Sequence, residues 1–184
     1  MPTLNVRGKL LRCAVVALAV ALTSAVGGCG SSGPATDGPL SSAENGRTPQ
    51  GANCAPGGEL QSFGTERFTN YGHVTVVLDR VALLHPQNER LVGSYAVPGI
   101  WLIGVVPWPP RYAGIPATWA HRQPVHGFRL APGQSFDMVL GVAAAAAGQA
   151  SSEGMLVYYH DSAGSYLTTD HVAMIVAATS NGCQ

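Results

Sequence analysis

The stretch MLVYYHDSAGSYLTTDHVAMIVAA, residues 155–178, decides the fold class because it has the pattern of a β-hairpin. Its first part is apolar and aromatic, and DSAG at residues 161–164 is typical of a turn. After the turn, a two-residue period places one set of side chains on one side of a strand: Tyr166, Thr168, Val172, Met174 and Val176. The stretch therefore predicts an antiparallel sheet.

Strand patterns also occur before this hairpin. HVTVVLDRVALL, residues 73–84, alternates and then changes phase at Asp79, which predicts a bulge or two successive strands. GIWLIGVV, residues 99–106, is continuously apolar and predicts a strand buried on both faces. Residues 136–142 alternate after the turn APGQ and predict a half-buried strand. About six or seven short strands separated by Gly/Pro turns indicate an all-β, antiparallel sandwich.

The amino terminus has the layout of an export signal. Basic residues precede the apolar run CAVVALAVALTSAV, residues 13–26, which is shorter than the 18 or more residues of a membrane-spanning helix. VGGC, ending at Cys29, resembles the lipobox of bacterial lipoproteins. This resemblance implies transfer of a diacylglyceryl group to the Cys29 thiol, cleavage before Cys29, and acylation of the new amino terminus. The alternative is an ordinary secretory signal with a chance cysteine.

Three segments follow from this interpretation. Residues 1–28 are expected to be a lipoprotein signal peptide. Residues 29–53, rich in Gly, Ser, Pro and Ala, are expected to be a lipidated cysteine and a disordered linker, because they hold too little apolar surface to order themselves. As a flexible coil, such a linker would span about 25–30 Å. Residues 54–184 are expected to form the sandwich domain.

Two cysteines remain for the domain, Cys54 and Cys183, one near each end. Export places them in an oxidising compartment, where a disulfide persists. We therefore expect a Cys54–Cys183 bridge, with two unpaired thiols as the alternative.

The domain loosely resembles the small immunoglobulin-like secreted proteins and lipoproteins of high-GC Gram-positive bacteria. The resemblance rests on GHVTVVLDRVAL, LAPGQSFDMVLGV, MLVYYHDSAGSYLTT and the terminal Cys183. It implies an immunoglobulin-like sandwich in the cell envelope and says little about activity, because most members of this group have no assigned one.

The charge balance disfavours nucleic-acid binding. The chain has ten basic and ten acidic residues, and three of the basic ones, Arg7, Lys9 and Arg12, belong to the expected signal peptide. The slightly acidic remainder has no basic patch for phosphate backbones. The sequence also lacks the common motifs of hydrolases, zinc proteases and phosphate-binding loops, so we do not expect an enzyme or a cofactor.

Six histidines raise the alternative of a copper-binding envelope protein: His73, His85, His121, His126, His160 and His171. In the expected hairpin, His160 pairs near Ser165 or Tyr166, and His171 falls several positions farther along. These two histidines would not easily share a metal. His121 and His126, which flank a loop, stay open as ligands, but histidines that are exposed or satisfied in the core are the favoured interpretation, and we expect no metal site. A hydrolase acting on wall polymers is a third interpretation.

The most distinctive surface candidate is PWPPRYAGIPATWAHRQP, residues 107–124. Rigid aromatic side chains beside arginines are typical of binding surfaces, because they bury area at low entropic cost. The candidate residues are Trp108, Arg111, Tyr112, Trp119 and Arg122. The alternative is a loop whose tryptophans only cap the core. Together these features predict a lipoprotein on the extracytoplasmic face of the membrane, whose sandwich binds a cell-wall or protein partner.

Overall fold

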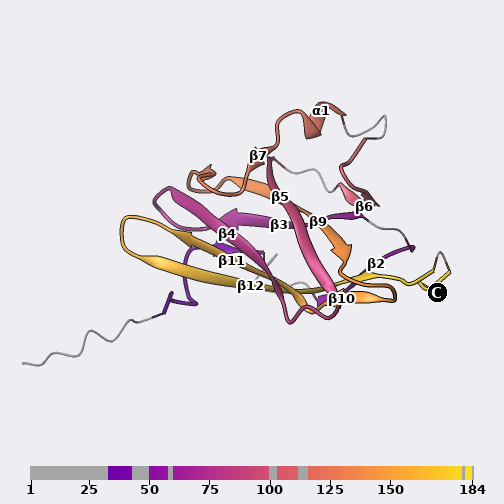
Figure 1. The fold of residues 1–184 in the computed structure, drawn as a ribbon. Coiled ribbons are helices and arrows are strands. Elements are labelled where there is room, and N and C mark those ends of the chain that lie inside the picture. The colour runs from indigo at the N-terminus through magenta and orange to yellow at the C-terminus, as the bar shows by residue number, and fades with distance from the viewer. Residues whose placement is uncertain are drawn as a thin grey trace, which may run out of the picture. The chain divides into compact units, whose positions relative to one another are not determined.

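Two β-sheets packed face to face form the part of the chain that the computed structural model describes (Figure 1). The described residues are 33–42, 50–57, 60–99, 103–111, 116–179 and 181–183. Among these residues, no helix is long and apolar enough to cross a membrane.

The first sheet has the strand order β1-β3-β9-β5-β7, and β6 also pairs with β3. All its pairings are antiparallel. Its strands are β1 (Leu40–Ser41), β3 (Gln61–Asn70), β5 (Glu89–Pro98), β6 (Gly104–Pro107), β7 (Gln123–Pro124) and β9 (Ser135–Ala144). A single turn of helix, α1 (Pro116–Trp119), lies between β6 and β7.

The second sheet has the order β10-β12-β11-β4-β8, and β2 pairs with β12. Its strands are β2 (Gln50–Ala55), β4 (Val76–Leu84), β8 (Arg129–Leu130), β10 (Ala150–Ser152), β11 (Gly154–His160) and β12 (Ser165–Val176). The predicted all-β sandwich is confirmed. The prediction of six or seven strands was too low, since the described residues form twelve, and β2 runs parallel to β12.

The hairpin and the bulge follow the sequence pattern. Strands β11 and β12 pair from Met155↔Asp170 to His160↔Ser165, so the hairpin prediction is confirmed. Where β4 pairs with β11, Tyr158 faces Arg80 and Tyr159 faces Leu78. Asp79 is therefore the extra residue of a β-bulge, and the phase change predicted there is confirmed.

Two predictions about burial were wrong. Residues 100–102 of the segment 99–106 lie outside the described residues, and the strand described there, β6, is a short edge strand of half-buried and exposed residues, because it pairs only with β3. Strand β9 is buried on both faces, because it lies between β3 and β5 and other segments cover its outer side. The fully covered central strand is thus the one whose sequence alternates.

Apolar side chains from both sheets fill the interior. The largest of these fully buried side chains include Tyr159, Phe63, Phe68 and Phe136. Phe68 and Phe136 stack at 5.6 Å between ring centroids. A smaller apolar cluster, Val97, Ile103 and Val139, forms separately from this core, and Trp108 and Trp119 pack against it. The sandwich therefore buries apolar surface outside its main core as well.

The expected linker is partly folded into the sandwich, which corrects the domain boundary at residue 54. The compact unit begins at Gly33. Leu40 is buried, its N–H donates to the Tyr159 hydroxyl at 3.1 Å, and its carbonyl accepts from the Thr168 hydroxyl at 2.6 Å. Residues 50–53 belong to β2. A polar composition did not prevent ordering, because backbone pairing and one buried leucine attach this segment to the sheets.

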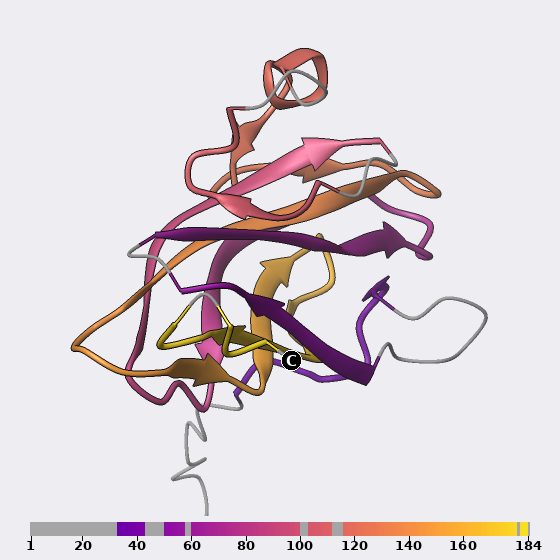
Figure 2. The same cartoon turned by 90° about the vertical axis from the view of Figure 1, so that its right-hand side faces the viewer.

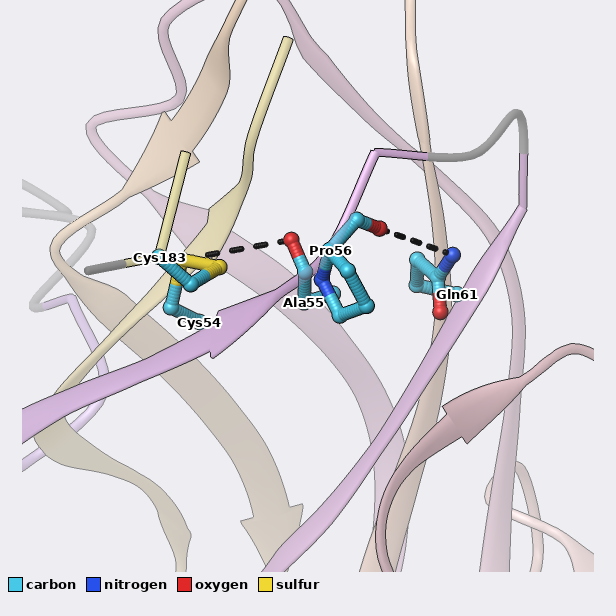
Figure 3. Close-up of a disulfide and its surroundings, with 5 residues drawn as sticks. All are labelled: Cys54, Ala55, Pro56, Gln61 and Cys183. Carbon is cyan, nitrogen blue, oxygen red and sulfur yellow. Dashed lines mark hydrogen bonds between the residues drawn. A yellow bond between two sulfur atoms is a disulfide. The ribbon is translucent and has the colours of Figure 1, made fainter. Parts of the chain in front are cut away.

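The predicted disulfide is confirmed. Cys54 and Cys183 are bonded, with 5.7 Å between their Cα atoms (Figure 3). Cys54 lies on β2, which belongs to the second sheet. Two residues later, the Pro56 carbonyl accepts a hydrogen bond from the Gln61 side chain at the start of β3 (Figure 3). The bridge therefore fastens the carboxyl terminus to a strand that leads directly into the first sheet.

Candidate ligand surface

Trp108 lies flat on the first sheet because two glycines leave room for its ring. A Cβ atom added at Gly141 of β9 would approach the Trp108 ring within 2.5 Å, and one at Gly93 of β5 within 2.6 Å. Any side chain at these positions would displace the indole, since real Cβ atoms do not approach other atoms so closely. The two glycines thus form a seat for Trp108 on two adjacent strands.

Two more aromatic rings pack around this indole. Tyr95 of β5 stacks beside Trp108 at 5.9 Å between centroids, with an interplanar angle of 27°. Trp119, from α1, meets Tyr95 edge-on at 5.2 Å and Trp108 at 6.0 Å. Figure 2 shows the segment that contains α1 standing over the outer side of the first sheet. We call Tyr95, Trp108 and Trp119 the aromatic cluster.

Arg122 completes one side of the cluster. Its guanidinium carbon lies 4.8 Å from the Trp119 ring centroid and 5.6 Å from that of Tyr95, within the range of cation–π attraction. Its Nη1 donates to the Trp119 carbonyl at 2.9 Å. Arg122 is exposed, and its guanidinium carries more N–H donors than this one bond uses.

An open pocket of about 450 Å³ lies over the aromatic cluster. It is lined by Tyr95, Trp108, Pro109, Pro110, Arg111, Trp119 and Arg122. The lining contains two guanidinium groups and no carboxylate. Flat aromatic faces, proline rings and fixed positive charges can together hold a planar or ring-shaped ligand that carries negative charge or carbonyl oxygens.

The structure brings together four of the five residues predicted for this surface. Trp108, Arg111, Trp119 and Arg122 line one pocket, whereas Tyr112 lies outside the described residues. Cys29 also lies outside them. The capping alternative is partly correct as well, because Trp108 and Trp119 are half-buried against the smaller apolar cluster.

Sequence reasoning missed the strand residues of the surface. Tyr95, Gly93 and Gly141 lie far from residues 107–124 along the chain and meet Trp108 only in the folded sheet. The signal available in the sequence was weak: glycine within a strand indicates a close approach by another group, but it does not say which.

Two buried carboxyl groups were also missed. Glu66 of β3 is 6 % exposed and Asp170 of β12 is fully buried, so one acid from each sheet faces the interior. Burial and the nearby carboxylate of Asp170 raise the pKa of Glu66 to about 7. Burial also raises the pKa of Asp170, although hydrogen bonds from Ser42 and the Val172 N–H oppose this. Asp170 shares the alternation of Val172, and that pattern could have revealed its inward orientation.

Two of the six histidines, His126 and His160, contact the same residue, Asp79. The Asp79 carboxylate bonds His160 Nδ1 at 2.8 Å, and the Asp79 carbonyl lies 2.9 Å from His126 Nδ1. His85 pairs separately with Glu153 at 2.8 Å. Within the described part of the chain, no group of three or more His, Cys, Asp or Glu side chains is placed to hold a metal ion.

Comparisons with known proteins find no matching family model and no matching curated protein sequence. Among solved structures, the chain is similar to the secreted serine protease VesC from Vibrio cholerae, with 13 % identity and a TM-score of 0.30 over 71 % of this chain and 22 % of that one. It is also similar to the ASH/PapD-like domain of human CEP192, with 12 % identity and a TM-score of 0.35 over 80 % and 92 %. The sandwich assignment rests on the sheets themselves.

Proposed function

We propose that this protein is a lipoprotein, anchored through Cys29 on the extracytoplasmic face of the cell membrane, whose sandwich binds a cell-envelope ligand. The aromatic cluster and its two arginines form the binding surface. The partner is a cell-wall polymer or another envelope protein.

The pocket over the aromatic cluster is the single observation that carries the binding proposal. It combines three aromatic rings and two guanidinium groups with no opposing carboxylate. Tryptophan, tyrosine and arginine are the residues most enriched where a few side chains supply most of a binding energy. The pocket over the cluster is open and Arg122 at its side is exposed, so the surface is reachable by a partner.

The anchor proposal is supported by the amino-terminal sequence. A basic start, a short apolar run and VGGC together have the layout of a lipidated export signal. More than one acyl chain holds a protein firmly on a bilayer, since each buried methylene contributes about 0.8 kcal/mol. The disulfide is consistent with an oxidising compartment.

The binding surface is tested with two variants, Trp119→Ala and Arg122→Gln. The probe is an insoluble cell-wall preparation from the producing cells, and bound protein is measured by co-sedimentation. We expect each variant to weaken binding about tenfold or more, as hot-spot residues do. Arg129→Gln is the matched control, because Arg129 is exposed and does not line this pocket. Wild-type binding by both pocket variants would refute this surface.

The anchor is tested by intact mass measurement of the membrane fraction. A chain that begins at Cys29 and carries acyl groups is the expected result, and Cys29→Ala should release the protein. An unlipidated chain that begins elsewhere would exclude the anchor.

A further inference from the structure

The chain enters the sandwich at one end of the second sheet. The Ala35 N–H donates to the Ser165 carbonyl at 3.0 Å, and the Leu167 N–H donates to the Ala35 carbonyl at 2.7 Å. These bonds fasten the chain beside the start of β12, next to the β11–β12 turn. From Ala35 onward, the position of the backbone is therefore set by the sheet.

This attachment limits the distance between the sandwich and the proposed anchor. Six peptide steps separate Cys29 from Ala35, and a fully extended chain advances at most about 3.6 Å per residue. The point of entry is therefore within about 22 Å of the acylated residue. That distance is a maximum for full extension. A linker that ran to residue 53, as the composition predicted, would have been four times as long and would have let the domain move much farther from the anchor.

Exposed apolar side chains lie at this same end. The loop between β3 and β4, residues 71–75, contacts the entering chain: the Tyr71 N–H donates to the Pro39 carbonyl at 2.9 Å. Within the described residues, the exposed large hydrophobic side chains are Tyr71 at 60 %, Val74 at 42 % and Leu60 at 39 %. Two of these three belong to this loop, close to the point of entry.

The chemistry of the loop suits the interfacial layer of a bilayer. Its sequence, YGHVT, contains no Asp, Glu, Lys or Arg, and His73 is its one titratable group besides the Tyr71 phenol. Tyrosine favours the headgroup level, where its ring is buried and its hydroxyl stays hydrated. The acids Asp37 and Asp161, which both act electrostatically on Tyr166 near the point of entry, give this end no attraction to anionic lipid, so the contact is apolar.

We infer that the β3–β4 loop rests in the interface of the bilayer that holds Cys29, with Tyr71 and Val74 as its contact residues. This inference rests on the proposed anchor.

The inference also orients the binding surface relative to the bilayer. Strand β9 pairs with the end of β3, next to the loop, through Ser135↔Thr69, and with the start of β3 through Gly141↔Ser62. Trp108 sits on Gly141, about 20 Å along β9 from the loop end at 3.3–3.4 Å per residue. The aromatic cluster therefore lies away from the lipid.

The test places a nitroxide label at Val74 through Val74→Cys in the lipidated protein, reconstituted into phosphatidylcholine vesicles. Cys54 and Cys183 are bonded to each other, so the introduced thiol takes the label. The matched control is Ala147→Cys, because Ala147 is exposed in the β9–β10 connection at the opposite end of β9. Collision rates with oxygen and with a water-soluble nickel chelate are measured for both labels.

We expect the nickel collision rate at Val74 to be several-fold lower than at Ala147, and the oxygen rate to be higher. Equal nickel rates at both labels in a protein whose mass shows acylation would overturn the loop contact and leave the anchor standing. A mass without acyl groups would overturn the anchor and the inference together.

Discussion

Because Glu66 and Asp170 are buried together, we predict that the stability of the folded protein depends on pH. In the folded protein the pKa of Glu66 is about 7, against 4.5 for the free side chain. Between these values the folded state holds a proton that the unfolded state has released. Stability therefore falls as the pH rises from 4.5 to 7, and the full loss is present above pH 7.

The size of the effect follows from the pKa difference. Each pKa unit corresponds to about 1.4 kcal/mol, so ionising Glu66 costs the folded state about 3 kcal/mol above pH 7. For a domain of this size, that lowers the melting temperature by roughly 10 °C. Burial raises the pKa of Asp170 as well, which acts in the same direction.

Glu66→Gln removes this penalty. The Thr65 hydroxyl donates to Glu66 Oε1 at 3.0 Å, and the amide oxygen of glutamine can accept the same bond. We expect the variant to melt up to roughly 10 °C above the wild type at pH 8 and close to it at pH 4.5.

The assay is thermal unfolding followed by circular dichroism at several pH values. Glu153→Gln is the matched control, because Glu153 is an exposed glutamate that pairs only with an exposed histidine in the described residues. The reasoning is refuted if Glu66→Gln shows the same dependence of melting temperature on pH as the wild type.

Three further changes probe the fold and the surface. Leu40→Ala should cost about 2–5 kcal/mol in urea unfolding, since a buried leucine is truncated, whereas a free linker would show no loss. Gly141→Val should displace the Trp108 ring, shift tryptophan emission to longer wavelength and cost about 1–3 kcal/mol. Gly164→Ala is the control, because its Cβ would meet only the Tyr166 hydroxyl at an ordinary 4.0 Å, and unchanged emission in Gly141→Val would contradict the seat. Cys54→Ala should cost up to about 5 kcal/mol, because the bridge closes a separation of 129 residues; an unchanged melting temperature would show that the bridge constrains nothing.

The fold class could be predicted from the sequence because a strand shows a two-residue alternation within a few neighbouring residues. Alternation and turn residues predicted the hairpin at residues 155–178, and the change of phase at Asp79 predicted the bulge. The cysteine pair was predictable because the expected signal peptide and lipobox account for the other two cysteines, which leaves only Cys54 and Cys183 to pair. Residues 107–124 stood out for the same kind of reason, since aromatic, proline and arginine residues lie close together along the chain.

Only the tertiary structure decided which groups meet across the sheets. The burial of β9 on both faces depends on its neighbours, and the place of Leu40 depends on strands more than a hundred residues away. The seat of Trp108 needs glycines from two different strands, and the pKa of Glu66 depends on burial between the sheets and on a carboxylate from the opposite sheet. A sequence determines periodicity and turns through interactions between near neighbours, whereas burial, contact and electrostatic coupling depend on distances that exist only after the two sheets have packed.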